Sequence, residues 1–146
     1  MRFAFKTAPQ NTDFAGQYYQ LTSARCEPKP VQKPHPPICV GGSGERRTLR
    51  TAARFAQHWN FVGGTPAEFA RKRDVLHAHC RDIGRDPREI MLSSHVRLPP
   101  DGDTGPVVDT VAELGELGLD LAIVIVPPPH DPRVLTPLAE ALAPLS

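Results

Sequence analysis

Four short apolar runs alternate with helical patterns along residues 38–146, and this alternation constrains the fold more than any other feature. The expected strands are Ile38–Val40, His58–Val62, Ile90–Leu98 and Leu121–Val126, and the expected helices lie at about 45–56, 65–83, 106–117 and after Asp131-Pro132. Strands that alternate with helices indicate βαβ units and a parallel sheet. We therefore predict an α/β fold of four βα units.

Local signals mark the ends of these elements. Thr65 is expected as the N-cap of a helix and Pro66 as its first residue. Glu68 stands three residues after Thr65 and completes a capping box. Gly84 and Gly118 are expected to end two helices. The uninterrupted apolar run 121–126 predicts a strand buried on both faces of the sheet.

The N-terminal stretch differs from the rest of the chain. Residues 1–37 contain prolines at positions 28, 30, 34, 36 and 37, which exclude long helices there. We predict an irregular, proline-rich leader over residues 1–37, followed by one domain over residues 38–146.

A glycine-rich turn, Gly41-Gly42-Ser43-Gly44, joins the first expected strand to the first expected helix. Glycines allow close approach of the backbone to an anion, and the first N–H groups of a helix lack internal partners. We predict a phosphate site at Gly41, Gly42, Ser43 and Gly44, with Arg46 nearby. The alternatives are a tight βα turn without a ligand and a Ser43 hydroxyl that only caps the helix. The sequence lacks the P-loop lysine and the glycine spacing of a dinucleotide-binding motif.

Arg46 and Arg47 are expected in the first helical turn, where a cation is unfavourable. Two adjacent arginines there indicate an anionic partner, such as a phosphate or an oligoglutamate tail. The alternative is a solvated helix face, because Arg47, Arg50 and Arg54 recur at helical spacing.

Composition excludes several functions. The 17 Lys+Arg and 16 Asp+Glu nearly balance, so we expect no nucleic acid or membrane partner. Three widely spaced cysteines do not form a disulfide framework, which favours a reducing cytoplasm. His77, His79 and Cys80 lack the spacing of a helical zinc site, so no metal is predicted. His95 and Arg97 alternate on an expected strand, where both can face a barrel interior.

Several segments together resemble the luciferase-like monooxygenase superfamily. They are Phe14–Leu21 ("F-x-G-x-x-Y-x-L"), Pro28–Gln32 with Pro36-Pro37, Gly41–Leu49, Ala56–Asn60 and Ile83–Pro87. The resemblance covers residues 11–146 and implies a TIM-barrel oxidoreductase that uses flavin or deazaflavin. It also implies that the Gly-Ser-Gly turn holds the cofactor phosphate, with coenzyme F-420 as first choice and FMN as second. Gln57 departs from the family pattern, which has an acid there.

Only half of such a barrel is expected here. A TIM barrel takes roughly 250 residues and eight βα units, so the chain corresponds to the C-terminal half. We expect it to need a missing N-terminal half or a second copy in a homodimer. The functions left open are a cofactor-binding oxidoreductase, a non-catalytic remnant and a subunit that completes another barrel. No catalytic residue is assigned.

Overall fold

A computed structural model describes residues 12–25 and 27–145. The chain divides into two compact units, of which the first ends at Pro37 and the second begins at Ile38. In the first unit, strands β1 (Thr12–Ala15) and β2 (Gln20–Ala24) form an antiparallel hairpin. The predicted irregular leader therefore contains regular structure. The hairpin is mostly exposed and lacks the apolar alternation that reveals a strand in sequence.

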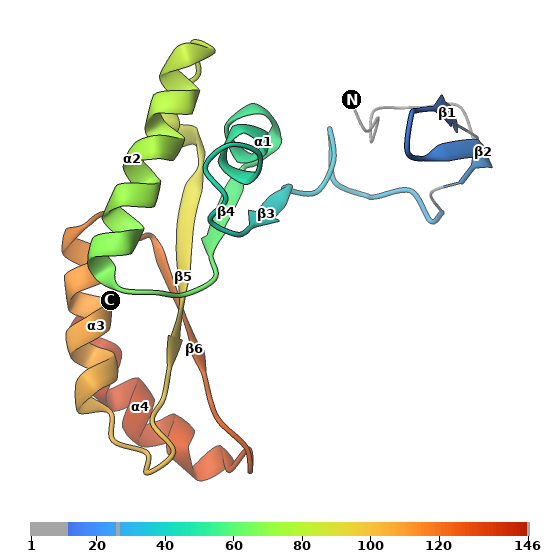
Figure 1. Ribbon diagram of the computed structural model, residues 1–146. Helices are drawn as coiled ribbons and strands as arrows, with labels where there is room; N and C mark the ends of the chain where they lie inside the picture. The colour runs from blue at the N-terminus through green and yellow to red at the C-terminus, as the bar shows by residue number, and fades with distance from the viewer. Residues whose placement is uncertain (1–11, 26, 146) are drawn as a thin grey trace. The chain divides into compact units, whose positions relative to one another are not determined.

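The second unit is the predicted α/β fold of four βα units (Figure 1). A parallel sheet has the strand order β3-β4-β5-β6, with strands at Cys39–Gly41, His58–Phe61, Met91–Arg97 and Leu121–Ile125. The helices are α1 (Thr48–Phe55), α2 (Pro66–Asp82), α3 (Gly105–Glu116) and α4 (Leu135–Leu142). Short 3-10 helices lie at Pro87–Glu89, Pro132–Val134 and Ala143–Leu145. Each strand neighbours the next one in sequence, as in a continuous segment of a TIM barrel.

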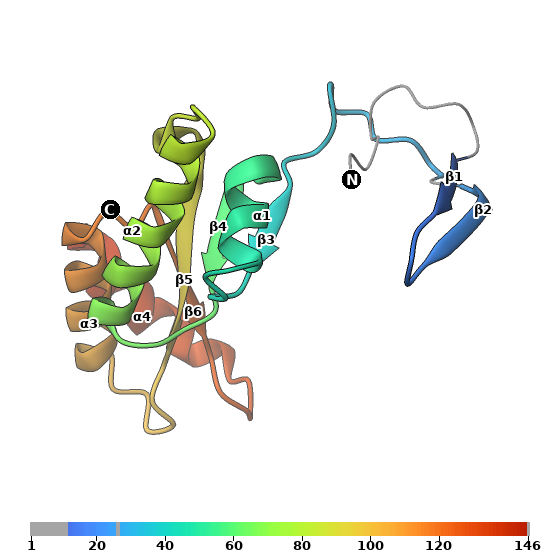
Figure 2. The same ribbon diagram turned by 45° about the horizontal axis from the view of Figure 1, so that its top comes forward.

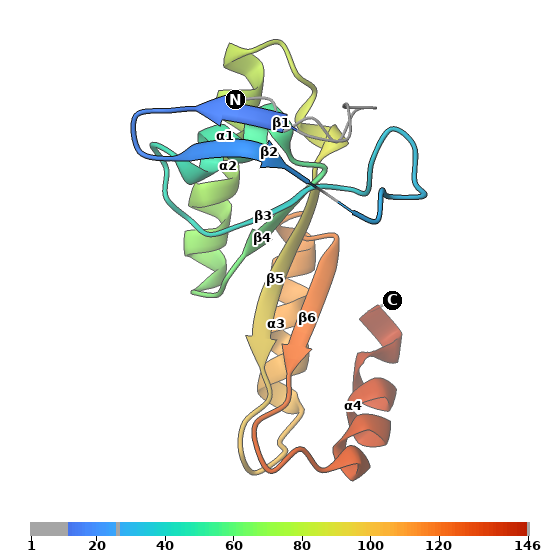
Figure 3. The same cartoon turned by 90° about the vertical axis from the view of Figure 1, so that its right-hand side faces the viewer.

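Helices α1, α2 and α3 lie on one face of the sheet (Figures 2 and 3). The core between them contains an aromatic cluster in which Trp59 stacks on Phe69 at 6.0 Å and Phe61 meets Phe69 edge-on at 5.8 Å. Trp59 and Phe69 are completely buried. These aromatic contacts fix α2 against β4, the strand beside the glycine turn.

Among the described residues of the second unit, no helix lies on the opposite face of the sheet. Strand pairing places Asn60 beside Ser93 and His58 beside Met91 on this face. Leu121 and Met91 are exposed to 43% and 40%. The prediction that the strand 121–126 is buried on both faces is therefore wrong for this chain, because β6 is an edge strand with one uncovered face.

Helix α2 begins and ends as the local chemistry predicts. The Glu68 backbone N–H donates to Thr65 Oγ1 at 3.2 Å, and the Thr65 N–H donates to Glu68 Oε2 at 2.9 Å. Gly84 follows the helix with a φ of 68°. Helix α1 differs, since it begins at Thr48 and not at the predicted residue 45. Residues 45–47 form a turn between the glycines and α1.

Candidate functional site

The glycine turn follows β3 at the carboxyl end of the sheet, and β4 makes two hydrogen bonds to the backbone of Gly42. The Gly42 N–H donates to the Asn60 carbonyl at 3.1 Å. The Trp59 indole Nε1–H donates to the Gly42 carbonyl at 2.8 Å. Because Trp59 is itself buried in the aromatic cluster, the position of the turn is coupled to the core.

The geometry requires glycine at position 42 and leaves little room for a side chain at position 44. Gly42 has a φ of +112°, a conformation that side-chain-bearing residues rarely adopt, and a Cβ there would lie 3.3 Å from Thr48 Cγ2. A Cβ on Gly44 would lie only 3.0 Å from Thr48 Oγ1. A Cβ on Gly41 would make an ordinary 3.8 Å contact with Val62. The turn therefore packs closely on the first residue of α1.

The backbone N–H groups of residues 43–47 make no hydrogen bond with any residue that the structure describes. None of these residues is buried. The Gly44 carbonyl accepts from the Leu49 N–H at 3.0 Å. A run of free donors beside a helix N-terminus fits an anion such as a phosphate.

Ser43 does not cap α1, so that alternative is wrong. The N-cap of α1 is Arg47, which makes no side-chain cap bond, and the first turn of the helix has no acidic residue. The Ser43 hydroxyl has no hydrogen-bond partner among the described residues. This hydroxyl is therefore available as a further donor beside the free N–H groups.

Glu45 ties the turn to α2. Its carboxylate accepts from Lys72 Nζ at 2.8 Å and from Arg71 at 2.5 Å. The His79 ring Nε2 lies 2.9 Å from the Glu45 carbonyl oxygen. The hydrogen bond from Lys72, followed by its positive charge, lowers the pKa of Glu45. The carboxylate that follows the glycines is thus occupied by two cations from another helix.

Arg46 and Arg47 are exposed, and neither has an ion pair or hydrogen bond from its side chain to a described residue. They lie in the turn before α1, not in its first turn as predicted. Arg46 therefore stays close in sequence to the free N–H groups, with its charge uncompensated.

The histidines, the cysteine and the arginine named above from the sequence do not gather at one site. Cys80 is buried, which raises the pKa of its thiol, and burial lowers the pKa of His77. Among the described residues, no group of three potential metal ligands comes together. His95 and Arg97 lie on the helix-free face of β5, as expected, with His95 half-buried and Arg97 exposed.

A polar network on that same face was not predicted from the sequence. Ser93 Oγ lies 2.6 Å from His58 Nε2 and accepts from Asn60 Nδ2 at 2.8 Å. Ser93 is completely buried and Asn60 is 8% exposed. The signal in the sequence was the alternation of His58 and Asn60 with Trp59 and Phe61. Because Ser93 is inaccessible, this network orders two strands and offers no nucleophile.

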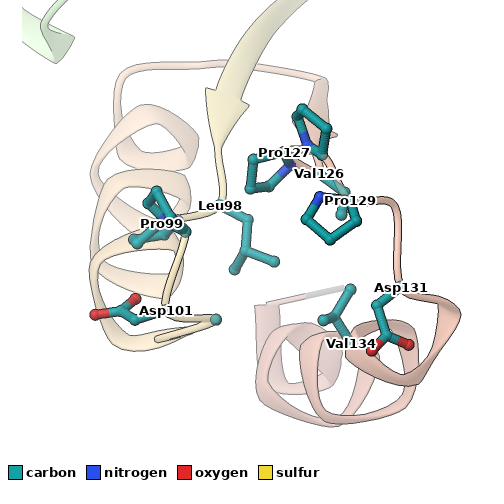
Figure 4. Close-up of a pocket in the computed structure, with 11 residues that line it drawn as sticks. Leu98, Pro99, Asp101, Val126, Pro127, Pro129, Asp131 and Val134 are labelled. Atoms are coloured by element: carbon teal, nitrogen blue, oxygen red, sulfur yellow. The ribbon is translucent and has the colours of Figure 1, made fainter.

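A hollow of ≈ 220 Å³ lies at the carboxyl ends of β5 and β6 (Figure 4). Its wall is mostly apolar and includes Leu98, Val126, Val134 and the prolines of two loops. The Asp131 carboxylate at its edge is paired with Arg133 at 2.6 Å. The hollow suits an apolar group. The Asp131 carboxylate is not free to act there, because it is paired with Arg133.

Comparisons with known proteins agree with this architecture. Residues 2–103 match the family model described as luciferase-like monooxygenase. Over 58 residues the chain is 38% identical to the FMNH(2)-dependent dimethylsulfone monooxygenase of Pseudomonas putida, covering 40% of this chain and 15% of that protein.

Two solved structures share the fold at low sequence identity. The coenzyme F420-dependent tetrahydromethanopterin reductase from Methanopyrus kandleri matches with a TM-score of 0.70 and 14% identity, over 91% of this chain and 57% of that one. An F420-dependent secondary alcohol dehydrogenase, solved with an F420-acetone adduct, matches with a TM-score of 0.67 and 13% identity, over 84% and 52%. The chain thus spans about half the length of these TIM-barrel-like structures. Within the described residues, no helix is both long and apolar enough to cross a membrane.

Proposed function

Because the chain belongs to the luciferase-like monooxygenase family, we propose that it is the C-terminal part of an oxidoreductase and binds a cofactor phosphate at Gly41, Gly42, Ser43 and Gly44. The observation that carries this proposal is the run of free N–H groups at residues 43–47. The positive φ of Gly42 and the unpaired Ser43 hydroxyl support it. Arg46 supplies a nearby positive charge.

The cofactor is a deazaflavin such as coenzyme F-420, or FMN. Relatives and structural neighbours include proteins named for each. When bound, such a group supplies the hydride or oxygen chemistry of the reaction. The residues of this chain bind the phosphate, and Trp59 and Asn60 hold the turn in place. The carboxyl ends of the neighbouring strands orient the rest of the cofactor, which is attached to the phosphate.

The chain acts within a larger barrel. Four parallel strands leave two open edges, and the helix-free face exposes Met91 and Leu121. A missing N-terminal half or a second copy in a homodimer would cover this face. We expect a cytoplasmic protein, since Cys39 and Cys80 are both free thiols. The alternative function is a truncated, non-catalytic remnant or a subunit that completes a barrel by dimerisation.

Sedimentation velocity separates these assemblies. We expect the chain made alone to associate or to be poorly soluble, with little or no oxidoreductase turnover. A compact monomer at tens of micromolar that turns over substrate with added deazaflavin or flavin would contradict the half-barrel account.

Cofactor titration tests the phosphate site itself in the assembly that sedimentation identifies. Ser43→Ala should weaken affinity by removing one donor, by about five- to tenfold. Gly42→Val should weaken it more, because a branched side chain at a φ of +112° displaces the turn. Unchanged affinity in both variants would remove the proposed site.

A further inference from the structure

The residue that follows the glycine turn, Glu45, is held by helix α2 at two points. Its carboxylate accepts from Lys72 Nζ at 2.8 Å and also from Arg71. Its backbone carbonyl oxygen lies 2.9 Å from the Nε2 atom of His79. Lys72 and His79 are seven residues apart, so they lie on the same side of α2, about 10 Å apart along its axis. Helix α2 therefore fixes both the side chain and the backbone of Glu45.

The hydrogen bond between His79 and Glu45 has a defined direction. A carbonyl oxygen can only accept, so His79 Nε2 carries the proton and donates it to this bond. Both the imidazolium ion and the neutral ring with its proton on Nε2 meet this condition. The His79 side chain is 17% exposed, and its other ring nitrogen, Nδ1, lies 3.9 Å from Asp82 Oδ2. Nε2 is thus the atom through which this side chain holds the turn.

This hydrogen bond sets the direction of one donor in the proposed phosphate site. The peptide bond between Glu45 and Arg46 is trans, so its C=O and N–H groups point in opposite directions. Because the Glu45 carbonyl is directed at His79 on α2, the Arg46 N–H is directed away from α2. That N–H is one of the free donors of residues 43–47. His79 therefore determines where one of these donors points.

Among the described residues, no other hydrogen bond orients this peptide. Residues 45–47 form a turn before α1, and neither the Glu45 carbonyl nor the Arg46 N–H is bonded to another part of that turn. Lys72 and Arg71 hold the Glu45 carboxylate and neutralise a charge that would otherwise repel a phosphate. The direction of the Glu45–Arg46 peptide thus depends on the bond from His79.

We propose that His79 is a positioning residue for the phosphate site, which holds the Glu45–Arg46 peptide so that the Arg46 N–H faces the bound phosphate. This inference rests on the proposed function of the glycine turn. In this role His79 acts through the Glu45 carbonyl without touching the ligand. A histidine that only packed α2 against the turn would contribute to stability and would not direct this N–H. The two roles predict different results when the donor at position 79 is removed and then restored.

Two amide replacements at position 79 test the proposal, with inorganic phosphate as the probe. The side-chain amide of His79→Gln reaches about as far as histidine Nε2, whereas the amide of His79→Asn is one methylene shorter. Amide NMR spectra are recorded while phosphate is titrated into the assembly that sedimentation velocity identifies. The native chain and His79→Gln should show shifts at residues 43–47, including the Arg46 amide.

His79→Asn should bind phosphate about tenfold more weakly, as expected for one lost hydrogen bond to a charged group, and its Arg46 amide should no longer shift. His77→Asn is the matched control. His77 is a half-buried histidine on the same helix, and its side chain makes no hydrogen bond with a described residue. This control should bind phosphate as the native chain does.

Native affinity in His79→Asn would overturn the proposal. Equal weakening in His79→Gln or in His77→Asn would also overturn it, because a restored donor would then have no effect or any change in α2 would suffice. The native chain gives a test that needs no variant, since shifts at Ser43 and Gly44 without one at Arg46 would contradict the assigned direction of that N–H. Failure of the phosphate site is a separate outcome, in which phosphate shifts none of residues 43–47 in the native chain, and the inference then falls with that site.

Discussion

Replacing Trp59 with phenylalanine should both destabilise the fold and weaken cofactor binding. The substitution removes the indole N–H that donates to the Gly42 carbonyl at 2.8 Å. Leaving that partly buried carbonyl without a partner costs about 1–2 kcal/mol. The smaller ring in a completely buried site adds about 1 kcal/mol. We therefore expect a loss of about 2–3 kcal/mol in the free energy of unfolding.

Phe69→Leu provides the matched control. Phe69 stacks on Trp59 at 6.0 Å but makes no contact with the glycine turn that corresponds to the indole hydrogen bond. The Phe69→Leu variant should lose about 1–2 kcal/mol in the free energy of unfolding while keeping its affinity for FMN. Urea unfolding should be followed by circular dichroism, because Trp59 is the sole tryptophan and its fluorescence is lost in the variant.

Two outcomes would contradict this prediction. Native stability in Trp59→Phe would show that the indole bond contributes nothing. An equal loss of FMN affinity in both variants would show that general loosening of the core, and not the bond to Gly42, controls the turn.

Three further predictions concern stability. Gly42→Ala should lose about 1–3 kcal/mol in urea unfolding, because φ is +112°, whereas Gly41→Ala should be nearly neutral; equal effects would contradict the geometry. Arg85→Met should lose about 2–3 kcal/mol, since Arg85 donates to the Ala53 and Ala56 carbonyls at the end of α1; unchanged helicity and stability would argue against this cap. The pKa of Glu45 is lowered, so its contribution is present above the ordinary value of 4.5 and is lost as pH falls through the folded pKa. In Glu45→Gln, the free energy of unfolding should therefore fall less steeply as the pH is lowered. An unchanged dependence on pH would show that the Glu45 carboxylate does not contribute to stability.

The sequence predicts the second unit well because its signals are local. The capping box joins Thr65 to Glu68, which are only three residues apart, and both of its hydrogen bonds are present. Apolar runs likewise locate β4, β5 and β6 to within a residue or two. The family adds the sheet order, which no local pattern contains.

Features that depend on pairing could not be predicted in the same way. The contact between His58 and Ser93 requires the register of two strands separated by a long helix. The start of α1 depends on how Gly44 packs against Thr48, not on a capping side chain. The exposure of β6 depends on which elements cover that face of the sheet, and none of the described helices of the second unit does. The hairpin at 12–24 has too few apolar residues for its strands to stand out.

At the candidate site, the sequence identifies the glycines but not what holds them. The glycines of the turn are predicted to let the backbone approach an anion closely, and Gly42 has a φ of +112°, which residues with a side chain rarely adopt. The bonds from Trp59 and Asn60 come from the next strand and are visible only in three dimensions. The sequence predicts Glu45 as the first residue of a helix, whereas in the structure its carboxylate joins the turn to Lys72.

Hydrogen exchange at short labelling times, measured with FMN and with riboflavin, tests the central claim most directly. The two ligands differ only in the phosphate, and the N–H groups of residues 43–47 are free to exchange in the described structure. The account predicts that FMN slows exchange at residues 43–47 and that riboflavin does not. Equal protection by riboflavin, or protection by FMN only at other residues, would contradict a phosphate site in this turn.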